Sequence, residues 1–410
     1  MREILASAAI AHLYISADKR GKLLKKYFIY TFGCKVNKYE SQLIAQKLNR
    51  NGFAASKNLE NADIIIFNSC CVTNDADKEC EYFIRKALKL DPFPKIILTG
   101  CLAKYKYSHL KTAFPQIEII PDKNSLYDNP QQTINNFDNR SRAFLKIQDG
   151  CDSFCSYCII PYVRNSLWSK PIETVLSEIE TLVDKNYFEI VLTGIHIGKF
   201  NGGLWSLLKR IVEIPRNFRV RLSSVELNEI DENLVGLIKD NPDKICSHLH
   251  IPLQSGSDKI LSLMNRKYRA KDYEKKINEL SRLMTNICLS ADIIVGFPQE
   301  TSSLHKETLN FLSNNPFSRL HVFRYSDRNG TKASTLDNKV SIEEIKKRSK
   351  EVLLIDEQKR KIFLAQNIGK KRQAVCIGAN KVLTDNYISA KNLKNQKGIF
   401  EIEIDNNCTM

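Results

Sequence analysis

The sequence predicts an α/β protein with an N-terminal open parallel-sheet domain, a central partial (β/α)6 barrel and a small C-terminal all-β barrel. Short apolar runs alternate with helical patterns along residues 27–120, and again over a longer span along residues 143–325. Such alternation is typical of parallel strands joined by helices. From residue 366 onward only short strand-like runs remain. At 410 residues the chain is long enough for two or three domains of this kind.

The composition is that of a globular protein with an excess of positive charge. Hydrophobic residues make up 43% and charged residues 26% of the chain, which is ordinary for a soluble fold. The 62 Lys and Arg residues against 46 Asp and Glu give a net charge of +16. An excess of this size predicts attraction to a polyanion such as RNA.

The cysteine content and the first residues of the chain predict where the protein works. Twelve cysteines in a chain without a clear export signal indicate a reducing compartment, the cytoplasm, and metal ligation rather than disulfides. The longest apolar stretch, Ile4 to Ile15, is too short to span a bilayer, so we expect no membrane partner. Residues 1–26 are interpreted as an extension of unclear role.

The N-terminal α/β domain is predicted over residues 27–138. Its strand-like runs are 27–32, 63–67, 95–99 and 117–120, and helical patterns lie around 38–50 and 75–90. The runs are continuously apolar, which favours strands buried on both faces of a parallel sheet. The polar stretch 123–142 is typical of a linker with a short helix.

Three of these strands are each followed within three residues by a cysteine: Cys34, Cys70 and Cys101, here called the strand-end triad. The carboxyl ends of neighbouring parallel strands lie side by side, and ligands bind there. We therefore expect the three thiols to meet and to hold a metal centre. The alternative is three small buried core thiols. Cys71 follows Cys70 directly, so which of the two is the ligand stays open.

The barrel is predicted over residues 139–365. Its strand-like runs are 143–149, 189–193, 219–223, 248–253, 289–295 and 320–325, and the clearest helical patterns are 172–179 and 271–285. In barrels of parallel strands, function lies on the loops that follow the strands. We therefore expect the functional side chains on those loops.

The loop after the first barrel strand holds Cys151, Cys155 and Cys158, here called the loop triad. Gly150 is predicted to turn the chain at the end of that strand. Thiolates are soft ligands that suit iron–sulfur clusters and zinc. Three ligands leave one position of a four-ligand site open, which favours a cluster with one open iron. Zinc with a distant fourth ligand and three unrelated thiols are the alternatives.

A small all-β domain is predicted over residues 366–410, after a long Lys/Glu-rich helix at 342–365. Its strand-like runs are 372–377, 387–390 and 398–404, and it carries seven Lys and Arg against four Asp and Glu. Small basic β-barrels often bind single-stranded nucleic acid, with an aromatic such as Tyr387 for stacking. A plain capping module for the barrel is the alternative.

The loop triad, with Tyr157 before its last cysteine, resembles the signature of the radical S-adenosylmethionine enzymes. The resemblance implies a 4Fe–4S cluster whose open iron binds the amino and carboxylate groups of S-adenosylmethionine. One electron from the cluster then cleaves the sulfonium to methionine and a 5′-deoxyadenosyl radical. The electron donor implied is a protein such as a flavodoxin or a ferredoxin.

The assembled order of motifs is similar to that of the radical methylthiotransferases. The shared segments are Gly33–Asn37, Asn68–Cys70, Thr99–Cys101, His250–Gly256, Met264–Tyr268 and Asp292–Pro298. The C-terminal module resembles the TRAM RNA-binding domain, although it is short and lacks some expected glycines. The resemblance covers about residues 27–408, and the segments Gly33–Asn37 and His321–Ser326 are most similar to the branch acting on N6-threonylcarbamoyladenosine in tRNA.

This resemblance implies a function. The base directly 3′ of the anticodon would have its adenine C2–H converted to C2–SCH₃. The loop triad and the strand-end triad would each hold a 4Fe–4S cluster, the first to make the radical and the second to carry the sulfur. Two S-adenosylmethionine molecules would be used, and the sulfur source is not implied. Isopentenyladenosine in tRNA and an aspartate of a ribosomal protein are alternative substrates, and a non-catalytic iron–sulfur RNA-binding protein is an alternative class.

Contacts to S-adenosylmethionine are expected from residues at the barrel strand ends. The set is Tyr157, Thr193, Gly194, Glu226, Gln254, Ile294 and Gly296. Gly296 lacks a side chain that would keep the adenine from the backbone. Arg266 is predicted to pair with either a carboxylate or a phosphate. His196 is interpreted as a structural histidine.

Overall fold

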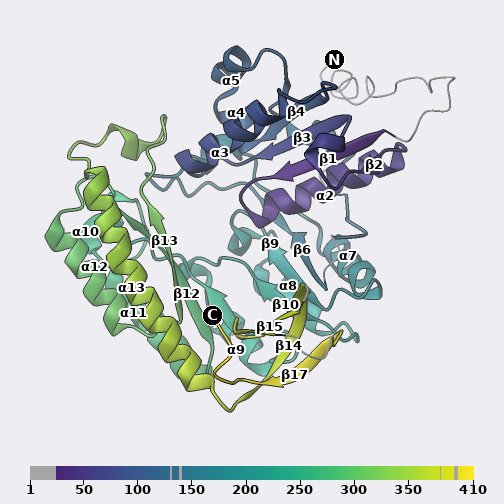
Figure 1. The fold of residues 1–410 in the computed structure, drawn as a ribbon. Helices are drawn as coiled ribbons and strands as arrows, with labels where there is room; N and C mark the ends of the chain where they lie inside the picture. Colours follow the sequence, from purple (N-terminus) through teal and green to yellow (C-terminus); the bar gives the residue numbers. More distant parts are fainter. Residues whose placement is uncertain (1–24, 130–131, 138–140, 379, 392–395) are drawn as a thin grey trace. The chain divides into compact units, whose positions relative to one another are not determined.

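The computed structural model describes residues 25–129, 132–137, 141–378, 380–391 and 396–410 (Figure 1). Nearly all of the predicted N-terminal extension lies outside the described residues. The chain forms two compact units. The first consists of the chain up to Asn136 together with Tyr162–Arg164, and the second of Phe137–Pro161 with Asn165–Met410. No helix in the described ranges is both long and apolar enough to cross a membrane.

The first unit is an open sheet of five parallel strands in the order β2-β1-β3-β4-β5. The strands are β1 (Lys26–Thr31), β2 (Ala54–Ala55), β3 (Ile64–Ser69), β4 (Lys95–Gly100) and β5 (Glu118–Ile120). The helices are α2 (Lys35–Arg50), α3 (Asn74–Ala87), α4 (Cys101–Tyr105) and α5 (Tyr107–Ala113), with 3-10 turns η1 (Leu59–Asn61) and η2 (Lys123–Leu126). This confirms the predicted N-terminal open parallel sheet.

The core of this sheet explains why its central strands are apolar without interruption. Every residue of β3 is buried, and Phe67 and Leu98 on neighbouring strands are 0% exposed. Helix α3 begins where the Thr73 hydroxyl accepts a hydrogen bond from the Ala76 amide, which caps the first turn. Buried parallel strands of this kind hold the loops at their carboxyl ends in fixed register.

The second unit contains six parallel strands in two three-stranded sheets, ordered β6-β9-β10 and β11-β12-β13. The strands are β6 (Arg142–Lys146), β9 (Glu189–Thr193), β10 (Arg219–Leu222), β11 (His248–His250), β12 (Cys288–Val295) and β13 (Arg319–Arg324). Parallel bridges from Val220 to Ile245 and from Ser224 to His250 join the two sheets. The result is the predicted partial (β/α)6 barrel.

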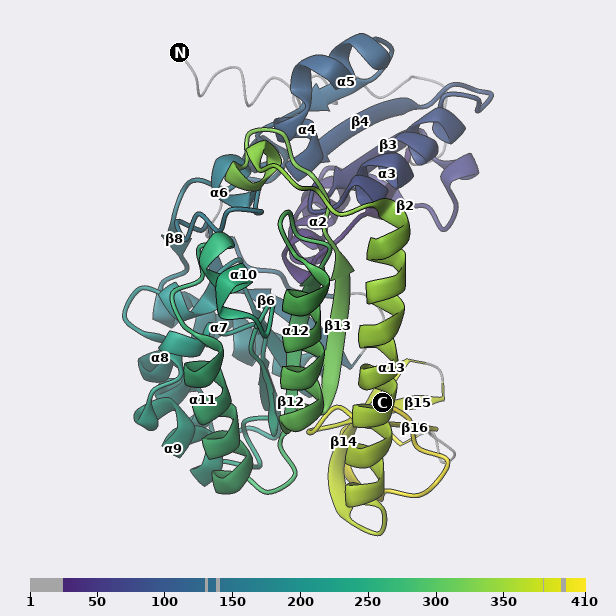
Figure 2. The ribbon, with the colours of Figure 1, turned by 90° about the vertical axis from the view of Figure 1, so that its left-hand side faces the viewer.

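Helices follow the barrel strands and lie outside them. They are α6 (Ile160–Val163), α7 (Ile172–Asp184), α8 (Leu204–Val212), α9 (Glu232–Asp240), α10 (Asp258–Leu263), α11 (Ala270–Leu283), α12 (Ser302–Asn314) and α13 (Ile342–Asn367). Two short strands, β7 (Gln148–Asp149) and β8 (Trp168–Ser169), pair beside the loop triad, and the remaining 3-10 turns are η3 (Ile197–Lys199), η4 (Leu227–Glu229) and η5 (Lys332–Thr335). Figure 2 shows α12 and α13 running alongside β12 and β13.

The C-terminal residues form a four-stranded antiparallel sheet in the order β16-β15-β14-β17. The strands are β14 (Lys371–Gly378), β15 (Lys381–Thr384), β16 (Ser389–Lys391) and β17 (Ile399–Glu403). Strand β15 was not predicted. The predicted run 387–390 begins too early, because Tyr387 has a φ of +72° and belongs to the turn between β15 and β16.

A buried carboxylate joins this C-terminal sheet to the barrel. Glu189 on β9 accepts from Arg219 Nε at 2.9 Å and from Arg221 Nε at 3.0 Å, and its Oε1 lies 2.7 Å from Arg142 Nε. Arg219 also donates to the carbonyls of Gln373 and Leu383, and Arg221 to those of Thr384 and Asp385, all at 2.9 Å. Glu189 therefore orients two arginines whose remaining donors hold the C-terminal strands.

Tyr387 lies at this same junction and not on a free surface. Its ring is 4.8 Å from the Arg221 guanidinium carbon and 4.5 Å from the His248 ring, centroid to centroid. These contacts do not test the predicted stacking of Tyr387 on a nucleic-acid base, which stays a prediction. The alternative of a module that caps the barrel agrees better with these contacts.

Removing the charge of Glu189 is expected to destabilise the second unit. In Glu189→Gln the arginines stay buried with no opposite charge, which typically costs about 3–5 kcal/mol. Urea unfolding at neutral pH measures the loss in unfolding free energy. Glu173, which is exposed and pairs with Arg210 on the surface, is the control, and Glu173→Gln should change the unfolding free energy by less than about 0.5 kcal/mol. Equal effects of the two substitutions would contradict the role of Glu189.

Low pH should weaken the junction between the barrel and the C-terminal sheet. Burial alone would raise the pKa of Glu189, but Arg221, Arg142 and Arg219 outweigh it and hold that pKa well below its usual range. Because the pKa of this carboxyl is lower in the folded chain than in the unfolded chain, where it is about 4.3, its ionised form stabilises the fold at pH values above that unfolded pKa. This stabilisation is lost as the pH falls through the folded-state pKa. The unfolding free energy should therefore fall more steeply on acidification in the native chain than in Glu189→Gln.

Candidate functional site

The strand-end triad follows three neighbouring strands of the first unit. Cys34, Cys70 and Cys101 come just after β1, β3 and β4, whose last residues are aligned in register. Cys70 and Cys101 are 5% and 6% exposed, whereas Cys34 is exposed. The aligned strand ends place the three thiols at one edge of the sheet, and whether they share a metal centre stays a prediction.

The turn at Gly33 fits closely around one of these thiols. Gly33 has a φ of +80°, and a Cβ built on it would lie 2.6 Å from both Cβ and Sγ of Cys70. Any side chain here would therefore occupy the space of the thiol, and most residues also avoid this backbone conformation. The glycine allows the Cys34 turn and the Cys70 side chain to approach each other.

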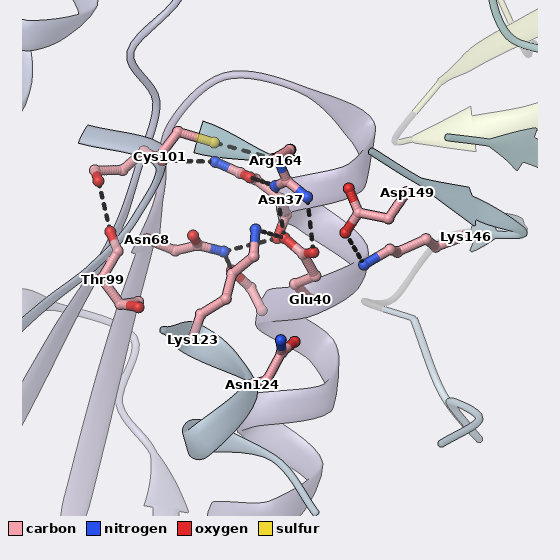
Figure 3. A network of polar contacts seen from close by, with 12 residues as sticks. Asn37, Glu40, Asn68, Thr99, Cys101, Lys123, Asn124, Lys146, Asp149 and Arg164 are labelled. Carbon is pink, nitrogen blue, oxygen red and sulfur yellow. Dashed lines mark hydrogen bonds and ion pairs between the residues drawn. The ribbon is translucent and has the colours of Figure 1, made fainter. Parts of the chain in front are cut away.

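Arg164 provides a fixed cation beside the triad (Figure 3). Its Nε donates to Cys101 Sγ at 3.3 Å, while Nη1 and Nη2 lie 3.1 and 3.0 Å from the two carboxylate oxygens of Glu40. Nη2 also donates to Asn37 Oδ1 at 2.8 Å, and the Lys123 ammonium pairs with the same Glu40. A planar guanidinium held on both sides in this way has a single orientation.

The thiols of the triad differ in their preference for the thiolate form. A hydrogen bond with Cys71 and then the nearby Arg164 outweigh burial and hold the pKa of Cys101 well below its usual range. Burial raises the pKa of Cys70 to about 12. Cys71 is 0% exposed and interacts with Cys101, so which of Cys70 and Cys71 would be the ligand stays open.

The loop triad lies in the second unit, after β7. Its three cysteines are partly buried, and the backbone turns tightly between the last two, where the Cys158 amide donates to the Cys155 carbonyl at 2.9 Å. The Ser153 amide approaches Cys151 Sγ at 3.4 Å. Backbone donors aimed at sulfur stabilise thiolates, as an iron–sulfur site requires.

His196, interpreted from the sequence as a structural histidine, lies against this loop. Its Nδ1 is 3.7 Å from Cys151 Sγ and 3.3 Å from Ser153 Oγ, and its Nε2 is 2.6 Å from Glu229 Oε1. Burial alone would lower the pKa of His196, but the contacts with Cys151 and Glu229 raise it to about 9. A charged imidazole at this position favours the thiolate of Cys151.

Arg266 is the corresponding cation at Cys155. Its Nη1 lies 3.5 Å from Cys155 Sγ and 3.2 Å from Glu226 Oε1, and Nη2 pairs with the other oxygen of Glu226. Nη2 also donates to the Pro252 carbonyl at 3.1 Å, and Nε to the Tyr268 hydroxyl at 3.1 Å. Of the two predicted partners for Arg266, the structure shows the carboxylate.

The other residues expected to contact S-adenosylmethionine lie at the barrel strand ends. Thr193 is buried at the end of β9, where its carbonyl accepts from the Ile147 amide at 2.9 Å. Gln254 has a φ of +75°, an uncommon conformation that clusters at functional sites. Tyr157 and Ile294 pack against the same apolar cluster around Phe297.

Two glycines in that set have packing reasons to be glycine. A Cβ on Gly194 would lie 2.9 Å from the Gln148 carbonyl oxygen, so β7 passes directly over it. A Cβ on Gly296 would lie 2.2 Å from Ile345 Cγ1, on α13, and the Gly296 amide donates to Glu300 at 2.6 Å. Whether either also approaches a cofactor stays a prediction.

The donor chemistry of both triads fits an iron–sulfur cluster. Each offers three thiols, an arginine nitrogen within 3.5 Å of one sulfur, and a glutamate that fixes that arginine. Within the described ranges no three Cys, His, Asp or Glu side chains lie close enough to bind a single metal ion. The fit of the two triads to iron–sulfur clusters therefore rests on the thiols, on the donors that contact them and, at the strand-end triad, on the absence of a side chain at Gly33.

Sequence reasoning missed the polar residues that surround the thiols. Arg164 lies 124 residues from Glu40 in the chain and His196 lies 45 from Cys151, so no local spacing pairs them. One signal was available, because Arg164 follows Cys158 by six residues in an apolar segment where a charge needs a partner.

Comparison with known proteins identifies the family of the chain. Residues 26–121 match the model described as Uncharacterized protein family UPF0004, and residues 145–312 match the Radical SAM superfamily. Threonylcarbamoyladenosine tRNA methylthiotransferase MtaB of Bacillus subtilis is 35% identical over 369 residues, covering 82% of this chain and 81% of the relative. The protein of the same name from Thermotoga maritima is also 35% identical and covers 86% of each chain.

A second group of relatives has a different named substrate. The tRNA-2-methylthio-N(6)-dimethylallyladenosine synthase of Thermodesulfovibrio yellowstonii is 32% identical, over 81% of this chain and 83% of its own. All these relatives are methylthiotransferases of tRNA by name.

Solved structures support the fold. The radical S-adenosylmethionine methyltransferase TsrM from Kitasatospora setae superposes with a TM-score of 0.55 at 13% identity, over 76% of this chain and 77% of that one. The cobalamin-dependent radical enzyme OxsB gives a TM-score of 0.51 at 12% identity, over 87% of this chain and 62% of that one. With the sequence matches, these comparisons show that the chain belongs to the radical S-adenosylmethionine tRNA methylthiotransferase family.

Proposed function

We propose that this enzyme methylthiolates the adenine C2 of N6-threonylcarbamoyladenosine directly 3′ of the anticodon, replacing the C2 hydrogen by SCH₃. The observation that carries the proposal is the presence of two complete cysteine triads, each with its own arginine–glutamate pair. A radical enzyme that only abstracts hydrogen needs one such site. A second thiolate site supports the insertion of sulfur as well. The named activity of the relatives that are 35% identical supports the choice of base.

The two triads would hold two 4Fe–4S clusters. When bound, the clusters and two molecules of S-adenosylmethionine supply a one-electron cleavage of the sulfonium, the transferred sulfur and the methyl group. The chain's own residues hold and tune these groups. Arg266 and His196 place donors at Cys155 and Cys151, and Arg164 does so at Cys101.

The strand-end residues of the barrel would orient the cofactor. Thr193, Gln254 and Glu226 present polar groups at neighbouring strand ends, and Tyr157 with Ile294 presents an apolar wall. Gly194 and Gly296 would approach the cofactor at the same edge, besides allowing the close packing of Gln148 and Ile345. Since Glu226 already pairs with Arg266, it would act on the cofactor together with that arginine.

The remaining partners follow from the substrate and the chemistry. The net charge of +16 suits a tRNA substrate, and tRNA places the enzyme in the cytoplasm. A low-potential one-electron donor of the flavodoxin or ferredoxin kind would reduce the loop-triad cluster. Isopentenyladenosine in tRNA is the second candidate substrate, supported by the relatives at 32% identity.

Loss of the gene should remove one modified nucleoside. Mass spectrometry of tRNA nucleosides from cells with and without this enzyme is expected to show loss of 2-methylthio-threonylcarbamoyladenosine, with accumulation of the form lacking the methylthio group. The 2-methylthio-isopentenyladenosine level is the internal control. If that second nucleoside disappears instead, the substrate proposal is wrong while the methylthiotransferase assignment stands.

Anaerobic reconstitution should load both triads. Two 4Fe–4S clusters give about eight irons per chain, and Cys34→Ala should leave about four, because only the loop triad then keeps three thiolates. Cys376→Ala is the matched control, since this thiol lies on β14 and its loss should leave the iron content unchanged. Native protein with about four irons, and no change in Cys34→Ala, would refute the second cluster.

Gly33 should be needed for the geometry of the strand-end triad. In Gly33→Ala the new methyl group takes the space of the Cys70 thiol, so about four irons should be lost. Gly52 is the control, because it has a φ of +82° and nothing within 4 Å of a built Cβ. Gly52→Ala should show only backbone strain of about 1–2 kcal/mol and keep its iron. Full iron content in Gly33→Ala would show that the turn tolerates a side chain.

A further inference from the structure

We propose that Arg164 is a positioning residue for the strand-end triad: its guanidinium donates to the Cys101 thiolate, holds it in place and sets the reduction potential of the cluster bound there. This inference rests on the proposed function, because it takes the strand-end triad to hold a cluster. The spacing of the strand-end cysteines does not reveal this contact, because Arg164 lies 63 residues from Cys101 in the chain.

Arg164 contacts the strand-end triad through its Nε atom. Both terminal nitrogens are taken by Glu40, at 3.1 and 3.0 Å, and one of them also by Asn37 at 2.8 Å (Figure 3). Nε is left, and it points to Cys101 Sγ at 3.3 Å. The side chain is 4% exposed and that of Glu40 is 0% exposed, so water does not compete for these bonds. A lysine has no such planar set of donors and could not reproduce the arrangement.

The charge balance around the triad favours an electron-rich cluster. Glu40 is shared by two cations, Arg164 and Lys123, so this pocket carries one more positive than negative charge. In a buried setting such an excess stabilises thiolates and the added electron of a reduced cluster. Hydrogen bonds to cluster sulfurs act in the same direction. Removing Arg164 while keeping Glu40 and Lys123 would cancel this local excess of positive charge.

The position of Arg164 in the chain connects the two triads in sequence. Tyr162–Arg164 belongs to the first unit, whereas the residues on both sides of it in sequence belong to the second. Arg164 also follows Cys158, the last member of the loop triad, by six residues. One loop therefore supplies ligands for one triad and the fixed donor for the other.

The test isolates the strand-end cluster. In a full-length chain carrying Cys151→Ala, Cys155→Ala and Cys158→Ala, only the strand-end triad binds iron, and about four irons are expected. The midpoint potential of that cluster is measured by redox titration followed by electron paramagnetic resonance. In this background Arg164→Gln should lower the reduced-to-oxidised ratio at least tenfold at the parent's midpoint, a shift of about 59 mV to more negative potential for one electron.

Two further variants make the result specific. Arg164→Lys keeps the charge but loses the fixed donor, so its potential should fall between the parent and Arg164→Gln. Arg50 lies in the same unit and pairs with Asp128 at the surface, so Arg50→Gln should leave the potential unchanged. Loss of iron from both Arg164 variants with unchanged circular dichroism also supports the proposal, because the donor then holds the ligand in place.

Three other outcomes would contradict the proposed role of Arg164. Arg164→Gln with full iron and an unshifted potential would show that the contact does not act on the cluster, while the two-cluster function stands. A changed circular dichroism spectrum in both Arg164 variants would make the residue merely structural. If the parent itself binds no iron, the second cluster and the proposed function fail, and that result is distinct from the others.

Discussion

A glutamate that fixes a buried arginine side chain recurs at three places in the described part of the chain, and both candidate centres depend on it. Thiolates gathered at one site repel one another unless cations lie close by. A buried cation is itself costly unless a carboxylate neutralises it. Glu40 with Arg164, and Glu226 with Arg266, meet both requirements, because each arginine uses two nitrogens on the carboxylate and keeps contact with a sulfur. The third pair, Glu189 with Arg219 and Arg221, uses the same geometry to hold strands together.

The backbone makes these pairs possible by aligning strand ends. In the first unit β1, β3 and β4 end in register, so residues more than 30 positions apart arrive at one edge. In the second unit His196 and Glu226 lie on the loops after β9 and β10, whereas Arg266 lies between α10 and α11 and contacts Glu226 and Cys155 from there. Because helices cover these sheets elsewhere, the carboxyl edge is where side chains from several strands can converge.

The fold and the thiols could be predicted from sequence because their signals are local. An uninterrupted apolar run marks a buried strand, and a cysteine within three residues of its end marks a strand end; Cys34, Cys70 and Cys101 all satisfy this rule. The pairing of the donors with the thiols of the two triads has no local signal. Arg164 and Glu40 are 124 residues apart, and Arg266 and Cys155 are 111 apart, so only the folded chain pairs them. The contacts of His196 could not be predicted for the same reason, since they are with Cys151 and Glu229 on other loops.

Contacts that form only in the folded chain also reduce the number of charges that could bind RNA. A sequence count treats every arginine as available to a phosphate, yet Arg219 and Arg221 are 0% and 1% exposed and Arg164 is 7% exposed. These guanidiniums already hold carboxylates, carbonyls or a thiol, and releasing one would leave buried charge without a partner. Tyr387, the aromatic expected to stack on a base, is likewise engaged by Arg221 and His248. An attraction to tRNA would therefore come from exposed lysines and arginines, while the buried arginines hold thiols, carboxylates and the C-terminal sheet.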